Sequence, residues 1–292
     1  MQIVTDSGAD LAPEQTAGLE FHTVPLSITL AGVTYASGVD LQPAEFYALL
    51  ESSGHFPTTS QPSAGDFAAL YRRLAQVDPE ILSIHISSGL SGTLEAARAG
   101  AALVPEAHVT FFDSRTLSCP QGWMVQAAVK ARQASWSLEQ ILERLTLIQA
   151  QTQGLFTLES LKYLIHGGRI SHLKALAASV LKIRPVLGPD KVEGRYVTFS
   201  QDMTLKRAIQ RIPVLAAKMF PDCKRLRVQL LHGHNPEGLE LLRAAMQGAA
   251  MGGRFECLFE PAAVIAPVLG AHTGPSVIGL AVGDPQVFAG LI

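Results

Sequence analysis

Strand-like apolar runs alternate with helix-like segments through the first half of this chain, and this alternation is what most constrains its fold. The run 81–86 reads as a strand, and a helix-like segment at 93–103 follows it. A second strand at 109–112 and a helix at 121–133 repeat the order. Because parallel strands need long crossover connections, this pattern predicts a mostly parallel sheet covered by helices on both faces.

Helix-start signals predict further helices. Ser63 with Asp66, and Ser137 with Gln140, have the spacing of capping boxes, in which each side chain satisfies a free backbone N–H of the helix start. The first of these predicts a helix over 64–77, and the second a helix that runs to about Gln151. Apolar spacing and helix-terminating residues predict the other helices at 43–50, 160–166, 171–181, 205–219 and 236–247.

The pattern changes near Gly154. The segments 183–187 and 192–199 read as a hairpin, and two strand–helix units and a last strand follow. We therefore expect two α/β domains: residues 1–155 with a mostly parallel sheet, and residues 156–292 with a mixed sheet. The strands expected after the hairpin are 226–231, 255–260 and 277–282.

Length and composition exclude several classes of protein. At 292 residues the chain can bury large cores. Hydrophobic residues make up 48%, yet no stretch approaches the roughly 18 to 20 unbroken apolar residues of a membrane span. The N-terminus has no basic region followed by a long apolar one, so we expect a cytoplasmic protein. The net charge of −2 gives no reason to expect nucleic acid as a partner.

Cysteine and histidine spacing predicts neither a disulfide framework nor a metal site. Cys119, Cys223 and Cys257 are odd in number and widely spaced. His232 and His234 have a spacing seen in metal sites, but no third ligand stands out. Neither a Walker loop nor a dinucleotide-binding fingerprint is present. We therefore expect no metal and no other cofactor.

Two hydroxyl-rich turns, 58–63 and 87–93, each precede a predicted helix. A helix start offers unpaired N–H groups and a partial positive charge, and small hydroxyl side chains add donors without bulk. Ser and Thr are also common in turns for purely local reasons. Together, however, the two turns predict a pocket for a small acidic head group, since ligands gather at the carboxyl ends of parallel strands.

The second turn also resembles the nucleophile elbow of a serine hydrolase, with Thr93 in place of the second glycine. Asp113 and His272 follow Ser91 in the chain order of such hydrolases, so hydrolysis at Ser91 is an alternative function. A single histidine such as His272 often has only a structural role. The alternative role for His272 is a hydrogen-bond or ion-pair partner for a carboxylate.

Basic residues are concentrated between 161 and 211, a stretch with ten Lys and Arg and only three Asp and Glu. This stretch carries +7, which leaves −9 for the rest of the chain. Within it, Arg169 follows the helix break at Gly167 and Gly168 and is available to phosphate or to an acidic partner. A solvated basic face without a partner is an equal alternative.

The chain resembles the DegV family, which includes the fatty-acid-binding subunits of bacterial fatty acid kinases. The matching segments lie in family order along nearly the whole chain: 5–7, 59–63, 87–93, 113–114, 167–170, 181–185 and 272–275. The resemblance implies that one long-chain fatty acid lies between two α/β domains. It also implies that Thr59, Ser91 and His272 hold the carboxylate, with backbone donors around Ser60 and Gly92.

The resemblance further implies a protein that is not itself an enzyme. It would present the fatty-acid carboxylate to a separate ATP-dependent kinase, which makes the acyl phosphate, and Arg169 would contact that partner. Two positions depart from the family pattern: Ser276 stands where glycine is usual, and Met203 where many relatives carry arginine. The second departure weakens the case for a kinase partner unless Lys206 or Arg207 compensates, so a lipid-bound scaffold is a further alternative.

Overall fold

The computed structural model describes residues 1–173 and 183–291, and its first sheet is parallel throughout. The sheet has the strand order β2-β1-β6-β7. Its strands are β1 (Gln2–Asp6), β2 (His22–Val24), β6 (Glu80–His85) and β7 (His108–Asp113). Helices lie on both of its faces: α3 (Ala64–Ala75), α4 (Thr93–Ala101) and, on the opposite face, α5 (Ser118–Gln133). The expected parallel sheet is confirmed.

Side chains of β1 pack alternately into two separate hydrophobic cores, because successive side chains point to opposite faces of a strand. Val4 packs with Phe67 and Tyr71 in the cluster beneath α3 and α4. Ile3 packs with Trp123 of α5 in the larger cluster between the sheets. Both hydrophobic faces of the sheet are therefore covered.

The second sheet is mixed and has the order β10-β9-β8-β14-β11-β12, with β13 also paired to β11. Only the pairs β11–β12 and β11–β13 are parallel. The strands are β8 (Thr152–Thr157), β9 (Arg184–Pro189), β10 (Tyr196–Asp202), β11 (Arg225–His232), β12 (Glu256–Phe259), β13 (Ala263–Val264) and β14 (Ile278–Gly283). The mixed sheet and the hairpin of β9 and β10 were both predicted. Strand β8, which was not predicted, spans the expected domain boundary at residue 155.

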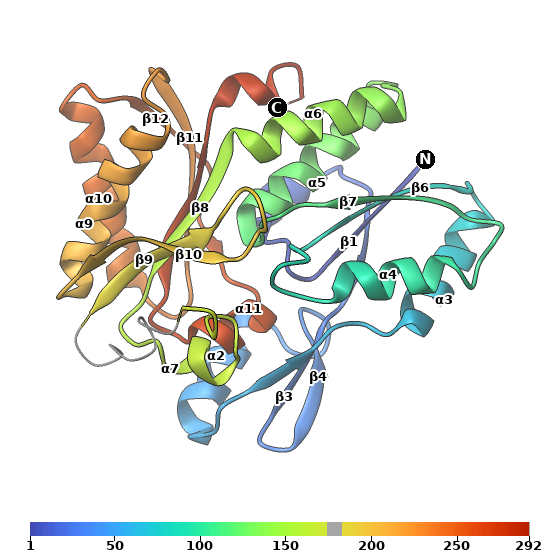
Figure 1. Ribbon diagram of the computed structural model, residues 1–292, viewed down its shortest axis with the longest axis horizontal. Helices are drawn as coiled ribbons and strands as arrows, with labels where there is room; N and C mark the ends of the chain where they lie inside the picture. Colours follow the sequence, from blue (N-terminus) through green and yellow to red (C-terminus); the bar gives the residue numbers. More distant parts are fainter. Residues whose placement is uncertain (174–182, 292) are drawn as a thin grey trace.

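Helices α9 (Leu205–Met219) and α10 (Pro236–Met251) cover the outer face of the second sheet, and α5 lies on its inner face (Figure 1). Nearly all of α5 is buried between the two sheets. Its polar side chains hydrogen-bond to both of them: Gln121 donates to Asp6 on β1, and the Trp123 indole donates to Gln229 on β11 at 2.6 Å. The helix therefore fixes the two halves of the chain relative to each other.

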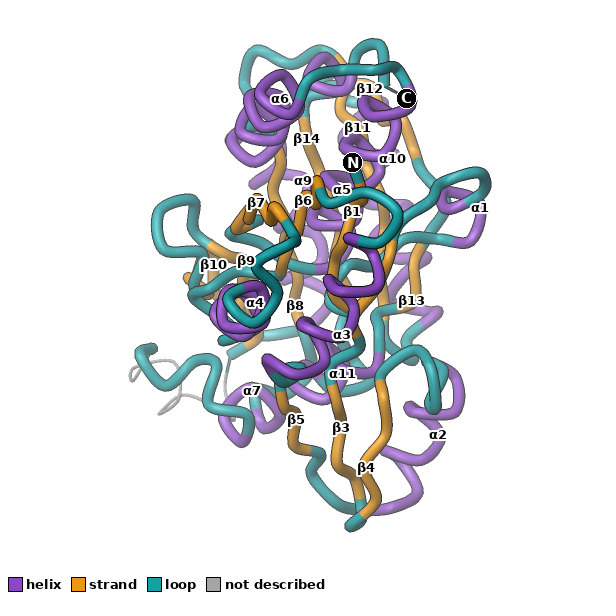
Figure 2. Tube along the Cα trace, turned by 90° about the vertical axis from the view of Figure 1, so that its right-hand side faces the viewer, coloured by secondary structure: helices purple, strands orange, loops and turns teal. Residues whose placement is uncertain are grey.

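A third, antiparallel sheet of order β4-β3-β5 was not predicted. It consists of β3 (Ser27–Leu30), β4 (Val33–Ala36) and β5 (Thr58–Ser60), and it projects from the lower end of the molecule (Figure 2). In its register Thr59 lies opposite Ile28. The sequence predicts a turn at Thr59, but the residue lies in a strand, because pairing with β3 extends its backbone.

His272 also lies in an unpredicted element, the last turn of helix α11 (Pro267–Thr273). Pro267 at the helix start and Gly274, with a φ of 75°, after its end are ordinary helix-boundary signals that the sequence reading passed over. The helix packs against α2 (Pro43–Ser53), α7 (Lys162–His166) and strands β3 and β5. His272 is thereby brought beside residues of the first half.

The remaining elements are α1 (Pro13–Thr16), α6 (Leu138–Ala150) and the 3₁₀ helix η1 (Pro285–Phe288). Both expected capping boxes form, at Ser63 and at Ser137. The helix expected over 171–181 lies outside the described residues from 174 onward.

Asp10, just after β1, ties three segments together inside the core. Its carboxyl group accepts a hydrogen bond from Ser118 Oγ at the start of α5 (2.5 Å) and one from the backbone N–H of Ala266, which precedes α11 (3.0 Å). Burial raises the pKa of Asp10 to about 7, and the two hydrogen bonds only partly offset this effect. Ionisation of Asp10 at neutral pH and above therefore opposes folding.

Asp10→Asn should remove a pH-dependent loss of stability. The folded pKa, about 7, exceeds the unfolded value of 3.8, so the contribution of Asp10 to stability is lost as the pH rises from about 4 through 7. The asparagine can accept from the N–H of Ala266 through Oδ1 and donate to Ser118 Oγ through Nδ2, so both contacts are kept without a charge. Above pH 7 we expect the free energy of unfolding of the variant, relative to the wild type, to be higher than at pH 4 by up to about 4 kcal/mol, at about 1.4 kcal/mol per pKa unit. Urea denaturation of both proteins between about pH 4 and 8 measures this difference. A difference that does not change with pH would contradict the prediction.

Candidate functional site

A cavity of about 210 Å³ lies where the two halves meet. Residues from β5, from the loop after β6, from β10 and from α11 form its wall. These residues are Leu26, Thr59, Ser60, Gln61, Ile86, Leu90, Ser91, Leu117, Arg169, Tyr196, Val268, Leu269 and His272. Four of the five residues predicted for a carboxylate site are among them, and the fifth, Gly92, adjoins Ser91 in the chain.

The two hydroxyl-rich turns meet at this cavity. Gln61 from the first lies against Gly92 of the second, so closely that a Cβ on Gly92 would stand 2.3 Å from Gln61 Oε1. Ser91 Oγ lies 2.8 Å from Thr93 Oγ1 and accepts the backbone N–H of Thr93 at the start of α4. A side chain at position 92 would therefore displace the end of the Gln61 side chain from the Ser91 turn.

Thr59 and His272 form a hydrogen-bonded pair in the cavity wall. Thr59 Oγ1 lies 2.8 Å from His272 Nε2, although 213 positions separate the residues in the chain. Burial, together with the charges of Arg169 and His166, lowers the pKa of His272 to about 3. The imidazole is consequently neutral at neutral pH.

A neutral imidazole leaves this pair with one unused donor hydrogen. If Nε2 carries the hydrogen and donates to Thr59, then the Thr59 hydroxyl hydrogen is free to donate elsewhere. In the other tautomer Thr59 donates to Nε2, and the Nδ1–H of His272 is free. In the described structure Nδ1 is buried against Gly167 without a hydrogen-bond partner, so the hydrogen that can reach a ligand is that of the Thr59 hydroxyl. An acceptor such as a carboxylate oxygen is the group that this pair lacks.

Arg169 places a positive charge in the wall of the same cavity. Its Nη1 donates to the carbonyl of Gly167 at 2.6 Å, and the side chain is half-buried. Within residues 1–173 and 183–291, no carboxylate lies within ion-pair distance of it, and segment 174–182 contains no Asp or Glu. Burial lowers its pKa, yet an arginine remains charged in proteins. The cavity therefore holds an uncompensated cation and no acidic side chain.

Four of the ten cations in the basic stretch have local partners or positions in the described structure. Arg169 lines the cavity, Arg184 pairs with Glu159, and Arg211 Nε lies 3.6 Å from Asp202 Oδ2. The Lys191 ammonium donates to the carbonyl of Gln149 at the end of α6. Lys174 and Lys182 lie outside the described residues, so a basic face stays a prediction for the rest of the stretch.

A smaller chamber of about 40 Å³ lies next to the cavity, within the core. Leu117, Tyr196 and Leu269 line both spaces. The other lining residues of the chamber are Ser118, Pro120, Gly154, Leu155, Phe156, Pro189, Leu231, Ile265, Thr273, Val277 and Leu280. The sequence reading missed all of these, since apolar residues at scattered positions have no local motif. The polar side chains of the cavity therefore lie beside a chiefly apolar chamber.

The geometry expected for a hydrolase does not form around Ser91. His272 bonds to Thr59, Asp113 Oδ2 accepts from Ser88 at 2.6 Å, and Ser91 bonds to Thr93. No hydrogen bond joins Ser91, His272 and Asp113, all of which lie in the described part of the chain. Among the described residues, no base is hydrogen-bonded to Ser91 Oγ to activate it as a nucleophile.

The spacing of His232 and His234 gives no metal site here. His234 Nδ1 lies 3.2 Å from Glu51 Oε1, and the described residues contain no group of three or more His, Cys, Asp or Glu that could hold a metal ion.

Among the described residues, none of the helices combines the length and the apolar character needed to cross a bilayer.

Comparison with known proteins gives matches along nearly the whole chain. A sequence model of the DegV family, described as uncharacterised proteins, matches residues 1–283. A DegV domain-containing protein of Listeria innocua is 31% identical over 279 residues, which are 95% of this chain and 96% of that protein.

Two solved structures show the same fold at full length. One is a DegV family protein from Thermus thermophilus, described by its fatty acid binding, with 30% identity, a TM-score of 0.85 and coverage of 97% of this chain and 99% of the other. The second, a stearic-acid-binding protein from Eubacterium ventriosum, has 26% identity and a TM-score of 0.85, with coverage of 97% and 98%.

Gly167→Ala should disrupt the His272 pair. An added Cβ would stand 2.0 Å from His272 Nδ1, so the imidazole must leave the position in which it bonds to Thr59, although the Gly167 backbone itself suits alanine. We expect a loss of about 1–3 kcal/mol in the free energy of unfolding, as for other overpacked sites.

Gly248→Ala is the matched control, because that position lies within helix α10 with nothing within 4 Å of the added carbon. It should leave stability unchanged or raise it by up to about 1 kcal/mol. Chemical denaturation compares the two variants. Equal effects would show that contact with His272 does not limit position 167.

Proposed function

Because this chain belongs to the DegV family, we propose that it binds a long-chain fatty acid in the cavity between its two halves. The carboxylate lies against Thr59, Ser91, His272 and Arg169, and the acyl tail follows the apolar chamber. The observation that carries the proposal is the unpaired cation in the same wall as the Thr59–His272 pair, next to an apolar chamber. Solved relatives of the same fold that are described as fatty acid binding support it.

The tail supplies most of the affinity in this proposal. Each buried methylene contributes about 0.8 kcal/mol, so ten of them give roughly 8 kcal/mol before the costs of binding. A helix terminus gives about 0.3–1 kcal/mol to an anion. The head-group contacts therefore orient and select the ligand. Since the inner chamber holds only about 40 Å³, side chains such as Leu269 and Tyr196 have to move when the tail enters.

The ligand is bound and presented, and the chain performs no chemistry of its own in this proposal. Hydrolysis at Ser91 is disfavoured because Ser91, His272 and Asp113 are not joined by hydrogen bonds. No metal or nucleotide is required, and a cytoplasmic location remains a prediction from the sequence. Lipid extraction from the purified protein, followed by mass spectrometry, tests the proposal directly. Protein that carries no fatty acid and rejects added palmitate would overturn it.

Removal of single head-group contacts should weaken binding of the free acid selectively. For Thr59→Val, Ser91→Ala and His272→Asn we expect losses of about 1.5–3 kcal/mol each, or roughly tenfold to a hundredfold in Kd. Calorimetric titration with palmitate and with methyl palmitate measures the effect. The ester, which lacks the anionic oxygen, should be affected much less, and equal losses for both ligands would contradict the placement of the carboxylate.

We further propose that an ATP-dependent kinase phosphorylates the bound carboxylate, with this chain as the substrate-presenting subunit. The family resemblance motivates this step, and Arg169 is the residue placed to contact both the head group and a partner. Met203 is exposed, and the neighbouring Lys206 and Arg207 are exposed cations that can take the place of the usual arginine. If no partner exists, the protein is a lipid-bound scaffold.

Arg169→Ala should reduce acyl phosphate formation at least tenfold when a fatty acid kinase, ATP and the loaded protein are combined. Fatty-acid binding by the variant has to be measured alongside, since Arg169 also lines the cavity. Arg184→Ala is the matched control, because this cation of the same stretch is already paired with Glu159. Unchanged phosphorylation of a fully loaded Arg169→Ala protein would contradict the assigned partner contact.

A further inference from the structure

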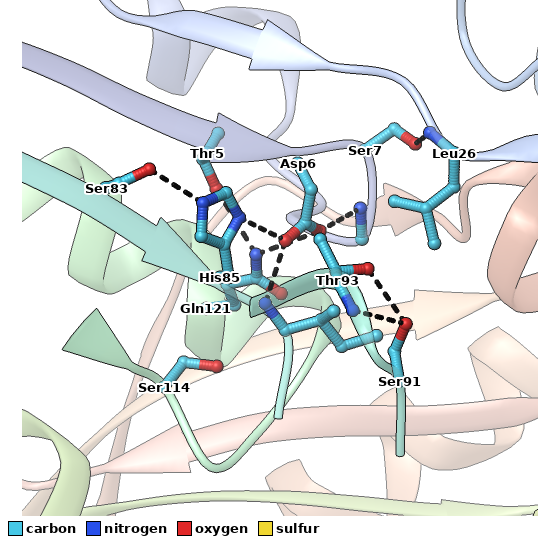
Figure 3. Close-up of polar contacts among 12 residues, drawn as sticks. Thr5, Asp6, Ser7, Leu26, Ser83, His85, Ser91, Thr93, Ser114 and Gln121 are labelled. Atoms are coloured by element: carbon cyan, nitrogen blue, oxygen red, sulfur yellow. Dashed lines mark hydrogen bonds and ion pairs between the residues drawn. The ribbon is translucent and has the colours of Figure 1, made fainter. Parts of the chain in front are cut away.

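The carboxylate of Asp6, at the end of β1, is a fully buried centre of hydrogen bonds (Figure 3). Its Oδ2 accepts from His85 Nδ1 and from the backbone N–H of Ile86, both at 2.9 Å. Its Oδ1 accepts from the N–H of Gly8 at 2.9 Å and from Gln121 Nε2 at 3.2 Å. Four donors thus converge on one carboxylate from three different elements.

His85 continues this network away from Asp6. Because a carboxylate only accepts, Nδ1 carries the hydrogen, and Nε2 faces Ser83 Oγ at 2.7 Å. Ser83 in turn lies 2.8 Å from the Tyr71 hydroxyl. The order of Asp, His and Ser is that of a catalytic triad, but Asp6, His85 and Ser83 are all fully buried. Because a substrate cannot reach these three residues, the arrangement positions the chain and does not catalyse a reaction.

The segment that this network holds is the turn that carries Ser91. Ile86 is the first residue after β6, and its N–H is fixed by Asp6. From there the chain folds back, with the N–H groups of Leu90 and Ser91 both donating to the carbonyl of Ser87 at 3.0 Å. Ile86, Leu90 and Ser91 all line the cavity. The position of Asp6 therefore determines where this wall of the cavity lies.

The loop after β1 is fixed from the same point. Asp6 Oδ1 binds the N–H of Gly8, and between them Ser7 Oγ accepts the N–H of Leu26 at 2.9 Å. Leu26 lines the cavity opposite the Ser91 turn and leads into β3, which pairs with the strand of Thr59. One buried carboxylate thus connects to both polar sides of the cavity.

We propose that Asp6 and His85 are positioning residues that set the selectivity of the cavity for a free carboxylate. The inference rests on the proposed function, since it assigns a role to residues behind the head-group site. Asp6 and His85 themselves do not touch the ligand. They hold the Ser91 turn at the place where its hydroxyl and the helix start behind it face an anionic head group.

Asp6→Asn tests the proposal with the smallest change of shape. An asparagine amide presents its NH₂ to one of the two donor pairs, so either Ile86 and His85 or Gly8 and Gln121 lose their acceptor. We expect the ratio of Kd for methyl palmitate to Kd for palmitate to fall by roughly tenfold or more, as for residues that orient ligand-binding groups elsewhere. His85→Phe, which retains the packing on Phe67, should lower the ratio in the same direction and answers the question if the asparagine variant does not fold.

Thr152→Val is the matched control, because it removes a buried hydrogen bond to the carbonyl of Ile148 at a residue that lines neither the cavity nor the chamber. It should lower thermal stability and leave the ester-to-acid ratio unchanged. If Asp6→Asn and His85→Phe likewise lose stability with an unchanged ratio, their role is structural only and the inference is wrong. A wild-type protein without preference for the acid would instead overturn the proposed function.

Discussion

The burial of helix α5 between two sheets is the constraint on which the rest of the structure depends. One side of this helix packs on the parallel sheet and the other on the mixed sheet, and few of its residues reach the solvent. Its polar groups are hydrogen-bonded to both sheets, through Gln121 to Asp6 and through Trp123 to Gln229. The two sheets therefore keep a fixed relation, and Thr59 and His272 meet across 213 positions of sequence.

The electrostatics of the cavity follow from this arrangement. Burial keeps His272 neutral, and the adjacent guanidinium of Arg169 acts in the same direction. Arg169 itself has lost part of its hydration without gaining a carboxylate partner in the described chain. A partly buried charge without a counter-ion is costly, so an anion beside Arg169 would be favourable. In the proposed function, selection by charge and affinity from the apolar chamber therefore come from different residues.

Local signals were sufficient to predict most of the regular elements. The predicted bounds of helix 205–219 agree with α9, and both capping boxes form, because these features depend on residues close in sequence. The three-stranded sheet escaped prediction since its strands are only three or four residues long and are stabilised by distant pairing. Helix α11, which carries His272, has local boundary signals in Pro267 and Gly274, but it is only seven residues long and was not predicted.

The site was predictable only in part. Hydroxyl-rich turns before helices indicated an anion site, and the family resemblance grouped Thr59, Ser91 and His272, which the fold brings to one cavity or its edge. Nothing in the sequence placed Arg169 in that wall, since its neighbours suggested an exposed basic face. Tyr196 and Leu269 were also missed, because a residue that lines a cavity has no signature until the chain is folded.

Carbon-13 NMR of palmitate labelled at its carboxyl carbon, bound to the wild-type protein, tests the central claim most directly. A carboxylate beside the Arg169 guanidinium and accepting hydrogen bonds should stay ionised well below its ordinary pKa. We predict one bound resonance at the position of the ionised form, unchanged as the pH is lowered past the titration of the free acid. A bound resonance that titrates at or above the pH of the free acid, or the absence of any bound resonance, would contradict the account.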